Sequence, residues 1–173
     1  RWARVAALTS PSMDNLNALV IPALDRRAPI LGIELAVQGE ELSFAAFDLW
    51  GDVDEPWRTL LDAARTDEAL AGAATRAQGR LRTLLSEHAV VVPRAAKAPA
   101  DVVRAAQRLL DAYLAALGDA PTRSTDEGTQ AQREPLQRLR ERPGGEAFLA
   151  SLFGDHWAAR FLDTVYYPLA GSE

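Results

Sequence analysis

The sequence predicts an α/β protein in which an antiparallel sheet packs against helices. Short apolar runs separated by turn signals fill the first fifty residues, and the connections between them are too short to hold a crossover helix. After Pro56, apolar residues recur instead at three- and four-residue spacing, which is typical of helices. Strands followed by helices favour an antiparallel sheet with helices packed on it, and both of its faces could be covered.

Four strands are expected before the first helix. Residues 15–22, 30–38 and 42–50 are apolar runs bounded by turn signals, and residues 1–9 form a fourth candidate by length and apolar content. Neighbours among them should be antiparallel and form a meander. The short β-branched run at 89–92 predicts one further strand between helices.

The helical spacing covers residues 55–64, 67–85 and 101–117. Gly118 provides a stop signal for the third helix. The polar, turn-rich residues 118–128 are expected to form a mobile surface loop.

The rest of the chain is expected to be helical. Pro143, Gly144 and Gly145 should interrupt it, and further helical segments are expected at 146–152 and 155–165.

Composition limits the function classes. The chain has 173 residues, of which 48% are hydrophobic and 25% charged, so we expect one folded domain over 1–173. Because the chain starts at Arg1 and not at Met, an N-terminal segment could be missing. A net charge of -5 argues against a general nucleic-acid binder. No apolar stretch approaches the ~20 residues of a membrane span. The chain contains no cysteine, and we expect a cytoplasmic protein.

One face of the predicted sheet has the character of a ligand site. Pairing across the loop 23–28 places Asn17 opposite Glu34, and pairing across the turn Gly39-Glu40 places Glu34 opposite Ala45. The same face is then expected to receive Gly32, Ala36 and Phe47. The opposite face, which should be core, receives Leu31, Ile33, Leu35, Val37, Phe44, Ala46 and Trp50.

Small residues around one carboxylate and one carboxamide leave space for a helix or a flat ligand. A carboxyl group covered by apolar material tends to keep its proton, because its charged form loses hydration. Glu34 could then act as a general acid. The alternative is that Glu34 points into solvent from an open sheet face, as most glutamates do.

Other chemistry has little support in the sequence. His88 and His156 lack the spaced partners of a metal site, and no GxGxxG, GxxxxGK[ST] or GxSxG motif is present. Redox chemistry would therefore need electrons from an external carrier. Asp48 is expected to have a structural role. The Arg-rich pieces 76–82 and 133–142 should be solvated helix faces, although they could dock an acidic protein or bind propionates.

Several collinear segments resemble the ferredoxin-dependent bilin reductases, a family that includes the related red chlorophyll catabolite reductases. Residues 17–34 (NALVIPALDRRAPILGIE) resemble the family's hairpin with its P-x-x-G-x-acid motif, and 44–49 (FAAFDL) its small-apolar run ending in Asp-Leu. Residues 86–94 (SEHAVVVPR) resemble the strand that bears an Arg, with Pro and Arg in exchanged order. Residues 152–161 (LFGDHWAARF) resemble the FG-x-x-W helix start, and Tyr167-Pro168 falls where members end in Phe-Pro.

The resemblance implies an α/β/α sandwich that holds a linear tetrapyrrole, such as biliverdin, between the sheet and the C-terminal helices. It implies reduction by single electrons from ferredoxin, through radical intermediates, with no tightly bound cofactor. Glu34 matches the proton-donating acid, which is usually Asp in bilin reductases and Glu in the chlorophyll catabolite reductases. Asn17 matches a position that is His or Asn in members. Arg94 would contact a substrate propionate, and Gly32, Ala45 and Phe47 would line the pigment.

One departure from the family pattern matters. Many bilin reductases have a second catalytic Asp shortly before the FG-x-x-W motif, where this chain has Arg142-Pro143-Gly144. Glu141 is the nearest acid in sequence. The leading hypothesis is a bilin-reductase-like oxidoreductase with Glu34 as proton donor, and the runner-up is a non-catalytic tetrapyrrole carrier on the same fold. A partner-binding protein without a small ligand is the third class.

Overall fold

The fold is built on one antiparallel sheet. The computed structural model describes residues 2–11, 13–141 and 145–167. The strands are β1 (Trp2–Thr9), β2 (Asp14–Ile21), β3 (Ile30–Gln38), β4 (Glu41–Trp50), β5 (Thr75–Arg76) and β6 (Val90–Val92). Their order is β1-β2-β3-β4-β6-β5, and each pair is antiparallel. The predicted meander and the predicted strand at 89–92 are confirmed.

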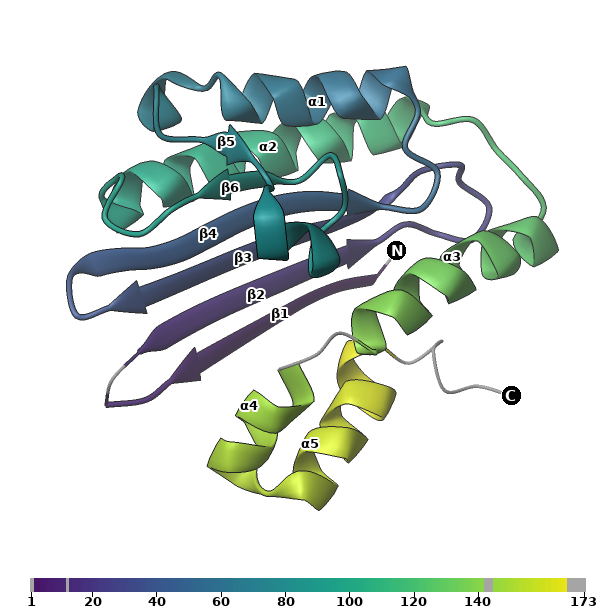
Figure 1. Ribbon diagram of the computed structural model, residues 1–173. Helices are drawn as coiled ribbons and strands as arrows, with labels where there is room; N and C mark the ends of the chain where they lie inside the picture. Colours follow the sequence, from purple (N-terminus) through teal and green to yellow (C-terminus); the bar gives the residue numbers. More distant parts are fainter. Residues whose placement is uncertain (1, 12, 142–144, 168–173) are drawn as a thin grey trace.

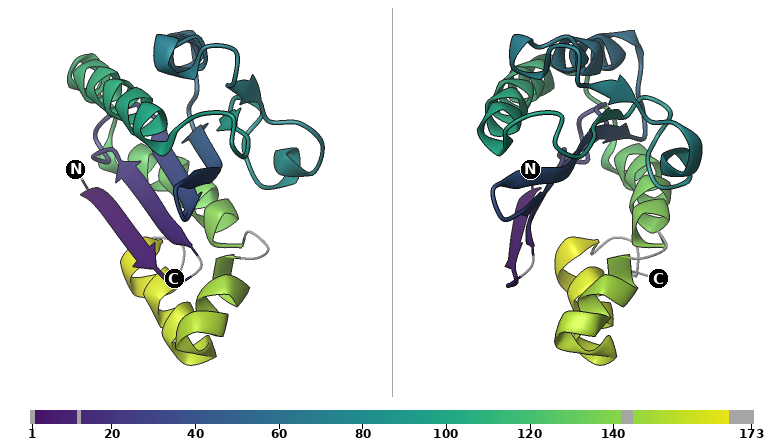
Figure 2. Two further views of the ribbon diagram at one scale, coloured as in Figure 1. Left: turned by 90° about the vertical axis from the view of Figure 1, so that its left-hand side faces the viewer. Right: turned by 60° about the vertical axis from the view of Figure 1, so that its left-hand side comes forward.

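Helices cover both faces of this sheet (Figure 1). The helices are α1 (Glu55–Arg65), α2 (Pro99–Asp119), α3 (Thr125–Arg140), α4 (Gly145–Phe153) and α5 (Asp155–Phe161), and a π-helical turn at Leu162–Tyr166 follows α5. In both views of Figure 2, α1 and α2 lie on the side of the sheet away from α4 and α5. The α/β/α sandwich with a central antiparallel sheet is confirmed.

The main core lies between the sheet and the layer of α1 and α2. Leu31 and Phe47 from the sheet are fully buried against Leu61 of α1 and Tyr113 of α2. The Tyr113 hydroxyl donates a hydrogen bond to the Pro29 carbonyl at 2.6 Å, and burial raises the pKa of this phenol. This hydrogen bond ties α2 to the start of β3.

A β-bulge interrupts the pairing of β3 with β4. Val37 pairs with Leu42, but Ala36 pairs with Phe44, so Ser43 has no partner on β3. Because side chains alternate between faces along a strand, one inserted residue turns every later side chain of β4 to the opposite face.

The bulge makes the predicted register of β4 wrong. Glu34 lies opposite Ala46, and not opposite Ala45. Ala45 and Phe47 are fully buried in the core under α1 and α2, whereas Asp48 joins Ala46 on the Glu34 face. The predicted pairing on the other side holds, since Asn17 lies opposite Glu34.

The predicted helix at 67–85 is wrong. This segment forms short 3₁₀ turns at Glu68–Leu70 and Gly79–Thr83 on either side of β5. Gly72 and Gly79 have φ values of +73° and +54°, a left-handed conformation that interrupts an α-helix. The end of the segment instead packs onto the Glu34 face of the sheet, where Leu85 is buried.

The predicted loop at 118–128 is also partly wrong. Helix α2 continues through Gly118 to Asp119, and α3 begins at Thr125. The Ser124 side chain accepts a hydrogen bond from the Glu127 backbone N–H, and the Glu127 carboxylate accepts one from the Ser124 backbone N–H. This capping box starts a helix of sixteen residues.

Two residues of the interruption expected before the last helices, Pro143 and Gly144, lie outside the described residues. Pro168, which was matched to the Phe-Pro end of family members, also lies outside them. Helix α4 begins at Gly145. Within the described residues, none of the helices combines the length and apolar character needed to cross a membrane.

Candidate functional site

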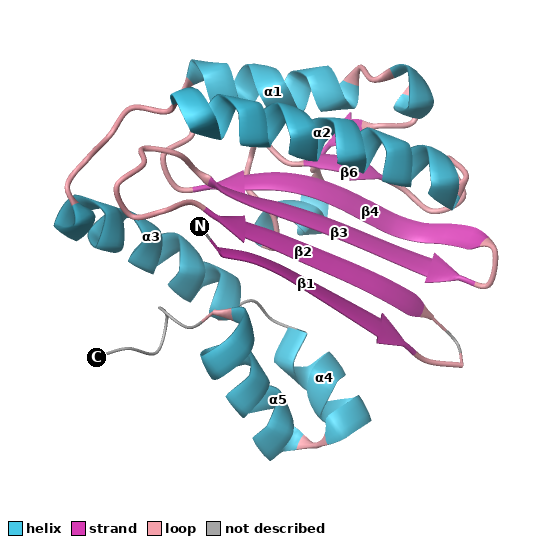
Figure 3. Cartoon of the chain, turned by 180° about the vertical axis from the view of Figure 1, so that it is seen from behind, coloured by secondary structure: helices cyan, strands magenta, loops and turns pink. Residues whose placement is uncertain are grey.

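A cavity of about 360 Å³ lies between the sheet and the C-terminal helices. Its lining comes from β1–β4, the segment before β6, and α3 to the π-helical turn. Figure 3 shows α4 and α5 next to the edge strand β1, on the opposite side of the sheet from α1 and α2. The lining residues are Ala6, Leu8, Asn15, Asn17, Glu34, Phe44, Leu81, Leu84, Leu85, Leu139, Arg140, Glu146, Leu149, Phe161, Leu162, Tyr166 and Tyr167.

Polar side chains occupy the sheet side of the cavity. Glu34 and Asn17 are half-buried cross-strand neighbours, so both side chains project to the same face. The Asn17 Nδ2 atom donates a hydrogen bond to Asn15 Oδ1 at 3.2 Å. Among the described residues, Glu34 forms no ion pair. The cavity therefore presents one carboxyl beside two carboxamides, and the predicted pairing of Asn17 with Glu34 falls in a ligand-sized space.

Aromatic side chains line the opposite side. Phe161, Tyr166 and Tyr167 are the aromatic residues of the helix side of the lining. Phe161 also stacks on the exposed Trp157, which is not a lining residue, with ring centroids 4.9 Å apart and planes 8° apart. Tyr166 lies 5.9 Å from Phe161 and makes an edge contact with Tyr167 at 4.9 Å. The π-helical turn after α5 brings the two tyrosines over the sheet, where both are buried. These rings offer flat apolar contacts to a ligand in the cavity.

Asp48 fixes the wall formed by Leu81, Leu84 and Leu85. Its carboxylate accepts hydrogen bonds from the Leu49 backbone at 2.8 Å and the Ser86 backbone at 2.9 Å. The Ser86 hydroxyl also donates to Asp48 Oδ1. These donors satisfy a carboxylate that is only 3% exposed. These contacts agree with the structural role expected for Asp48. They tie β4 to Ser86, the residue that directly follows the wall leucines.

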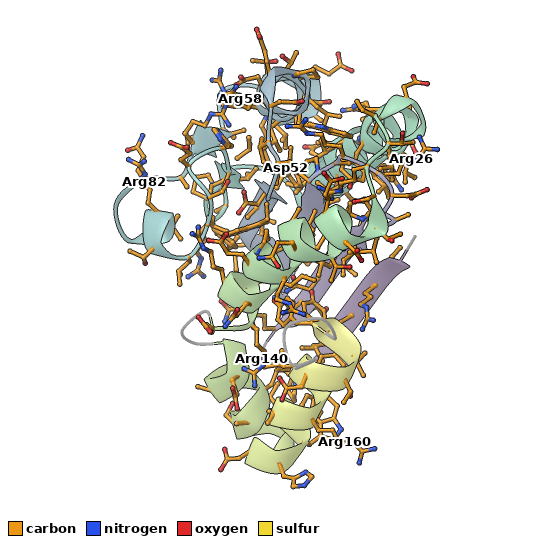
Figure 4. The ribbon with its side chains drawn as sticks, turned by 90° about the vertical axis from the view of Figure 1, so that its right-hand side faces the viewer. Arg26, Asp52, Arg58, Arg82, Arg140 and Arg160 are labelled. Carbon is orange, nitrogen blue, oxygen red and sulfur yellow. The ribbon has the colours of Figure 1, made fainter. Side chains whose placement is uncertain are left out.

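Arg140 joins the three C-terminal elements at the edge of the cavity. Its Nη1 atom lies 2.7 Å from Glu146 Oε2 of α4, and its Nε atom lies 2.6 Å from Asp163 Oδ1 of the π-helical turn. The hydrogen bond to Asp163, followed by that to Glu146, raises the Arg140 pKa. Figure 4 shows Arg140 where α3 meets α4 and α5, whereas Arg82 and Arg160 project outward. Sequence reasoning included Arg140 only as part of the Arg-rich piece 133–142, expected to be a solvated helix face, and it missed Glu146. Nothing in the spacing of these residues predicts their convergence.

Of the other predicted site residues, Gly32 lies beside the cavity, whereas Ala45, Phe47 and Arg94 lie away from it. Gly32 borders a small extension of the cavity, of about 30 Å³, that also contacts Glu34. Ala45 and Phe47 lie on the opposite sheet face and do not reach the cavity. Arg94 is exposed, 3.9 Å from Glu41, and is not a lining residue.

One further candidate from the sequence, Glu141, also lies outside the cavity. Glu141 accepts a hydrogen bond from the exposed Gln137 side chain and borders a different depression. Among the described residues, no group of three His, Cys, Asp or Glu side chains is placed to hold a metal ion.

Fold and site together define an α/β/α sandwich with a ligand-sized apolar cavity between its sheet and its C-terminal helices. Among solved structures, the chain is similar to tomato phytochromobilin synthase in complex with biliverdin, with a TM-score of 0.77 and 15% sequence identity. The match covers 99% of this chain and 67% of that chain. No family model and no curated protein matches the sequence. The resemblance to the ferredoxin-dependent bilin reductases is therefore confirmed at the level of the fold.

Proposed function

We propose that this protein binds a linear tetrapyrrole, such as biliverdin, in the cavity above Glu34 and reduces it. The observation that supports this most is the position of Glu34. It lies in a largely apolar cavity between sheet and C-terminal helices, on a fold similar to that of a phytochromobilin synthase solved with biliverdin.

The shape and chemistry of the cavity support a pigment ligand. Small-molecule sites usually enclose ~300–1,000 Å³ and are lined mainly by apolar side chains with a few polar groups. Here the polar groups gather on the sheet side, and the aromatic rings of Phe161, Tyr166 and Tyr167 lie on the helix side. A flat conjugated ligand would contact rings on one face and Glu34 with Asn17 on the other.

In the proposed reaction, reduction of one carbon–carbon double bond consumes two electrons and two protons. Ferredoxin, as an external one-electron donor, would supply the electrons in two steps, since the chain has no recognisable flavin or nucleotide motif and no cysteine for a cluster. Glu34 would donate one proton and water the other. Asn17 would hydrogen-bond the pigment and hold it in register with Glu34, while the aromatic side limits the access of water to the radical.

The second candidate is a tetrapyrrole carrier without catalysis, and one observation favours it. Glu34 and Glu146 are the carboxyl groups among the described lining residues, and Glu146 is paired with Arg140. This leaves one carboxyl free of an ion pair. A site with a single proton donor can bind a pigment without completing its reduction.

For both candidate functions, we propose that the protein works in the cytoplasm.

The two candidates separate in an anaerobic assay with biliverdin, ferredoxin and a ferredoxin reductase. We expect a red shift of the pigment spectrum on binding, followed by product bands. A complex that stays unchanged through many equivalents of reductant would exclude the enzyme and leave the carrier. The absence of any spectral change on mixing would exclude both.

Replacement of Glu34 tests its role in that assay. Glu34→Gln should bind pigment within a few-fold of wild type and form product about 100-fold more slowly, in line with the usual contribution of a general acid. Glu40→Gln is the matched control, because Glu40 lies exposed in the β3–β4 turn. Equal turnover of wild type and Glu34→Gln would show that the proton comes from another source.

A further inference from the structure

The charges around the cavity restrict which tetrapyrrole it can hold. Among the described lining residues, Glu34, Glu146 and Arg140 are the charged side chains. One guanidinium therefore accompanies two carboxyl groups, of which Glu34 is the proposed proton donor and Glu146 is the ion-pair partner of Arg140. Arg4, on the same sheet face, is not a lining residue, and Arg82 and Arg160 project away from the cavity (Figure 4).

Arg140, the one cation among the described lining residues, already has two carboxylate partners. Arg140 donates from Nη1 to Glu146 at 2.7 Å and from Nε to Asp163 at 2.6 Å, and its side chain is 19% exposed. A carboxylate entering the cavity would have to compete with these two carboxylates for the guanidinium. It would also approach the Glu146 carboxylate while losing its own hydration, which is costly for an unpaired charge.

We propose that the cavity prefers tetrapyrroles whose propionate side chains are esterified or otherwise uncharged over the free dicarboxylic pigments. This inference rests on the proposed function and specifies its substrate class. An ester removes the charge that the cavity repels and keeps the apolar surface that the leucines and aromatic rings would bury.

The test compares biliverdin with biliverdin dimethyl ester, titrated separately and followed by the pigment spectrum. The wild-type protein should bind the ester about tenfold more tightly than the diacid. This ratio is the one expected if the charge on the propionates disfavours binding by as much free energy as a pKa shift of about one unit represents. The preference should fall as salt concentration rises, because the repulsion is partly screened.

Variants separate charge from the greater apolar character of the ester. Glu146→Gln and Asp163→Asn each replace one charged partner of Arg140 by a neutral amide, so that more of the guanidinium charge is left uncompensated, and Asp163 does not line the cavity. Both variants should lower the ester preference to about threefold or less, mainly by tighter binding of the diacid. Glu141→Gln, outside the cavity, should leave the preference unchanged.

Two outcomes would overturn the inference while leaving the proposed function intact. One is equal or tighter binding of the diacid by the wild-type protein. The other is an ester preference that persists in Glu146→Gln and Asp163→Asn, since it would then reflect apolar partitioning alone. If neither pigment bound, the proposed function itself would fail.

Discussion

Replacement of Asp48 by Asn should destabilise the protein and loosen one wall of the cavity. The carboxylate is 3% exposed and accepts hydrogen bonds from two backbone N–H groups and the Ser86 hydroxyl. A hydrogen bond to a charged group contributes ~1.5–3 kcal/mol. Asn retains one acceptor oxygen but turns an NH₂ group toward the Ser86 N–H, so one bond is lost and the others weaken. We expect a loss of about 3 kcal/mol in the free energy of unfolding.

Urea unfolding measures this loss as a lower midpoint at an unchanged m-value. Asp111→Asn is the matched control, because Asp111 is exposed on α2 and should change the free energy of unfolding by less than about 0.5 kcal/mol. Pigment binding should weaken in Asp48→Asn, because Leu84 and Leu85 directly precede Ser86. A midpoint equal to that of the control would refute the assignment of Asp48 as the anchor of this wall.

Two other predictions concern the scaffold. Gly128→Ala should destabilise the protein by more than about 2 kcal/mol despite a helix-propensity gain of ~1 kcal/mol. A Cβ there would lie 1.8 Å from the Leu24 carbonyl oxygen. Gly118→Ala should be neutral or stabilising in thermal unfolding, because a Cβ at Gly118 would meet no atom within 4 Å beyond its own helix backbone and chain neighbours. Asp67 has a lowered pKa, chiefly through its hydrogen bond with Arg108. The urea midpoint of the wild-type protein should therefore be higher than that of Asp67→Asn near pH 7. The difference should shrink once the pH falls below ~3.9, the ordinary pKa of Asp in the unfolded chain, and should vanish below the lowered pKa of Asp67 in the folded protein. A difference independent of pH would contradict the ion pair.

The strand pattern and one side of the site could be predicted from the sequence. Short apolar runs and turn signals located β1 to β4, and the register across the loop 23–28 placed Asn17 opposite Glu34. The face of β4 could not be predicted, because no residue type marks the bulge at Ser43. A register argument is reliable only up to the first bulge, after which every side chain changes face.

The helix side of the site depends on contacts between distant segments, which residue spacing does not reveal. Arg140 meets Glu146 and Asp163 only after α3, α4 and the π-helical turn have packed together. At another wrongly predicted segment, however, the sequence contains a local signal that would have corrected the prediction. Ser124 and Glu127 have the spacing of a capping box, which marks a helix start within the predicted loop.

Pigment binding by two tryptophan variants of β1 tests the central claim most directly. Ala6 lines the cavity, whereas Ala7, the next residue, is exposed on the opposite sheet face. Ala6→Trp should fill the space beside Glu34 and weaken biliverdin binding at least tenfold, while Ala7→Trp should bind like wild type. Equal biliverdin affinity in both variants would contradict the location of the pigment between the sheet and the C-terminal helices.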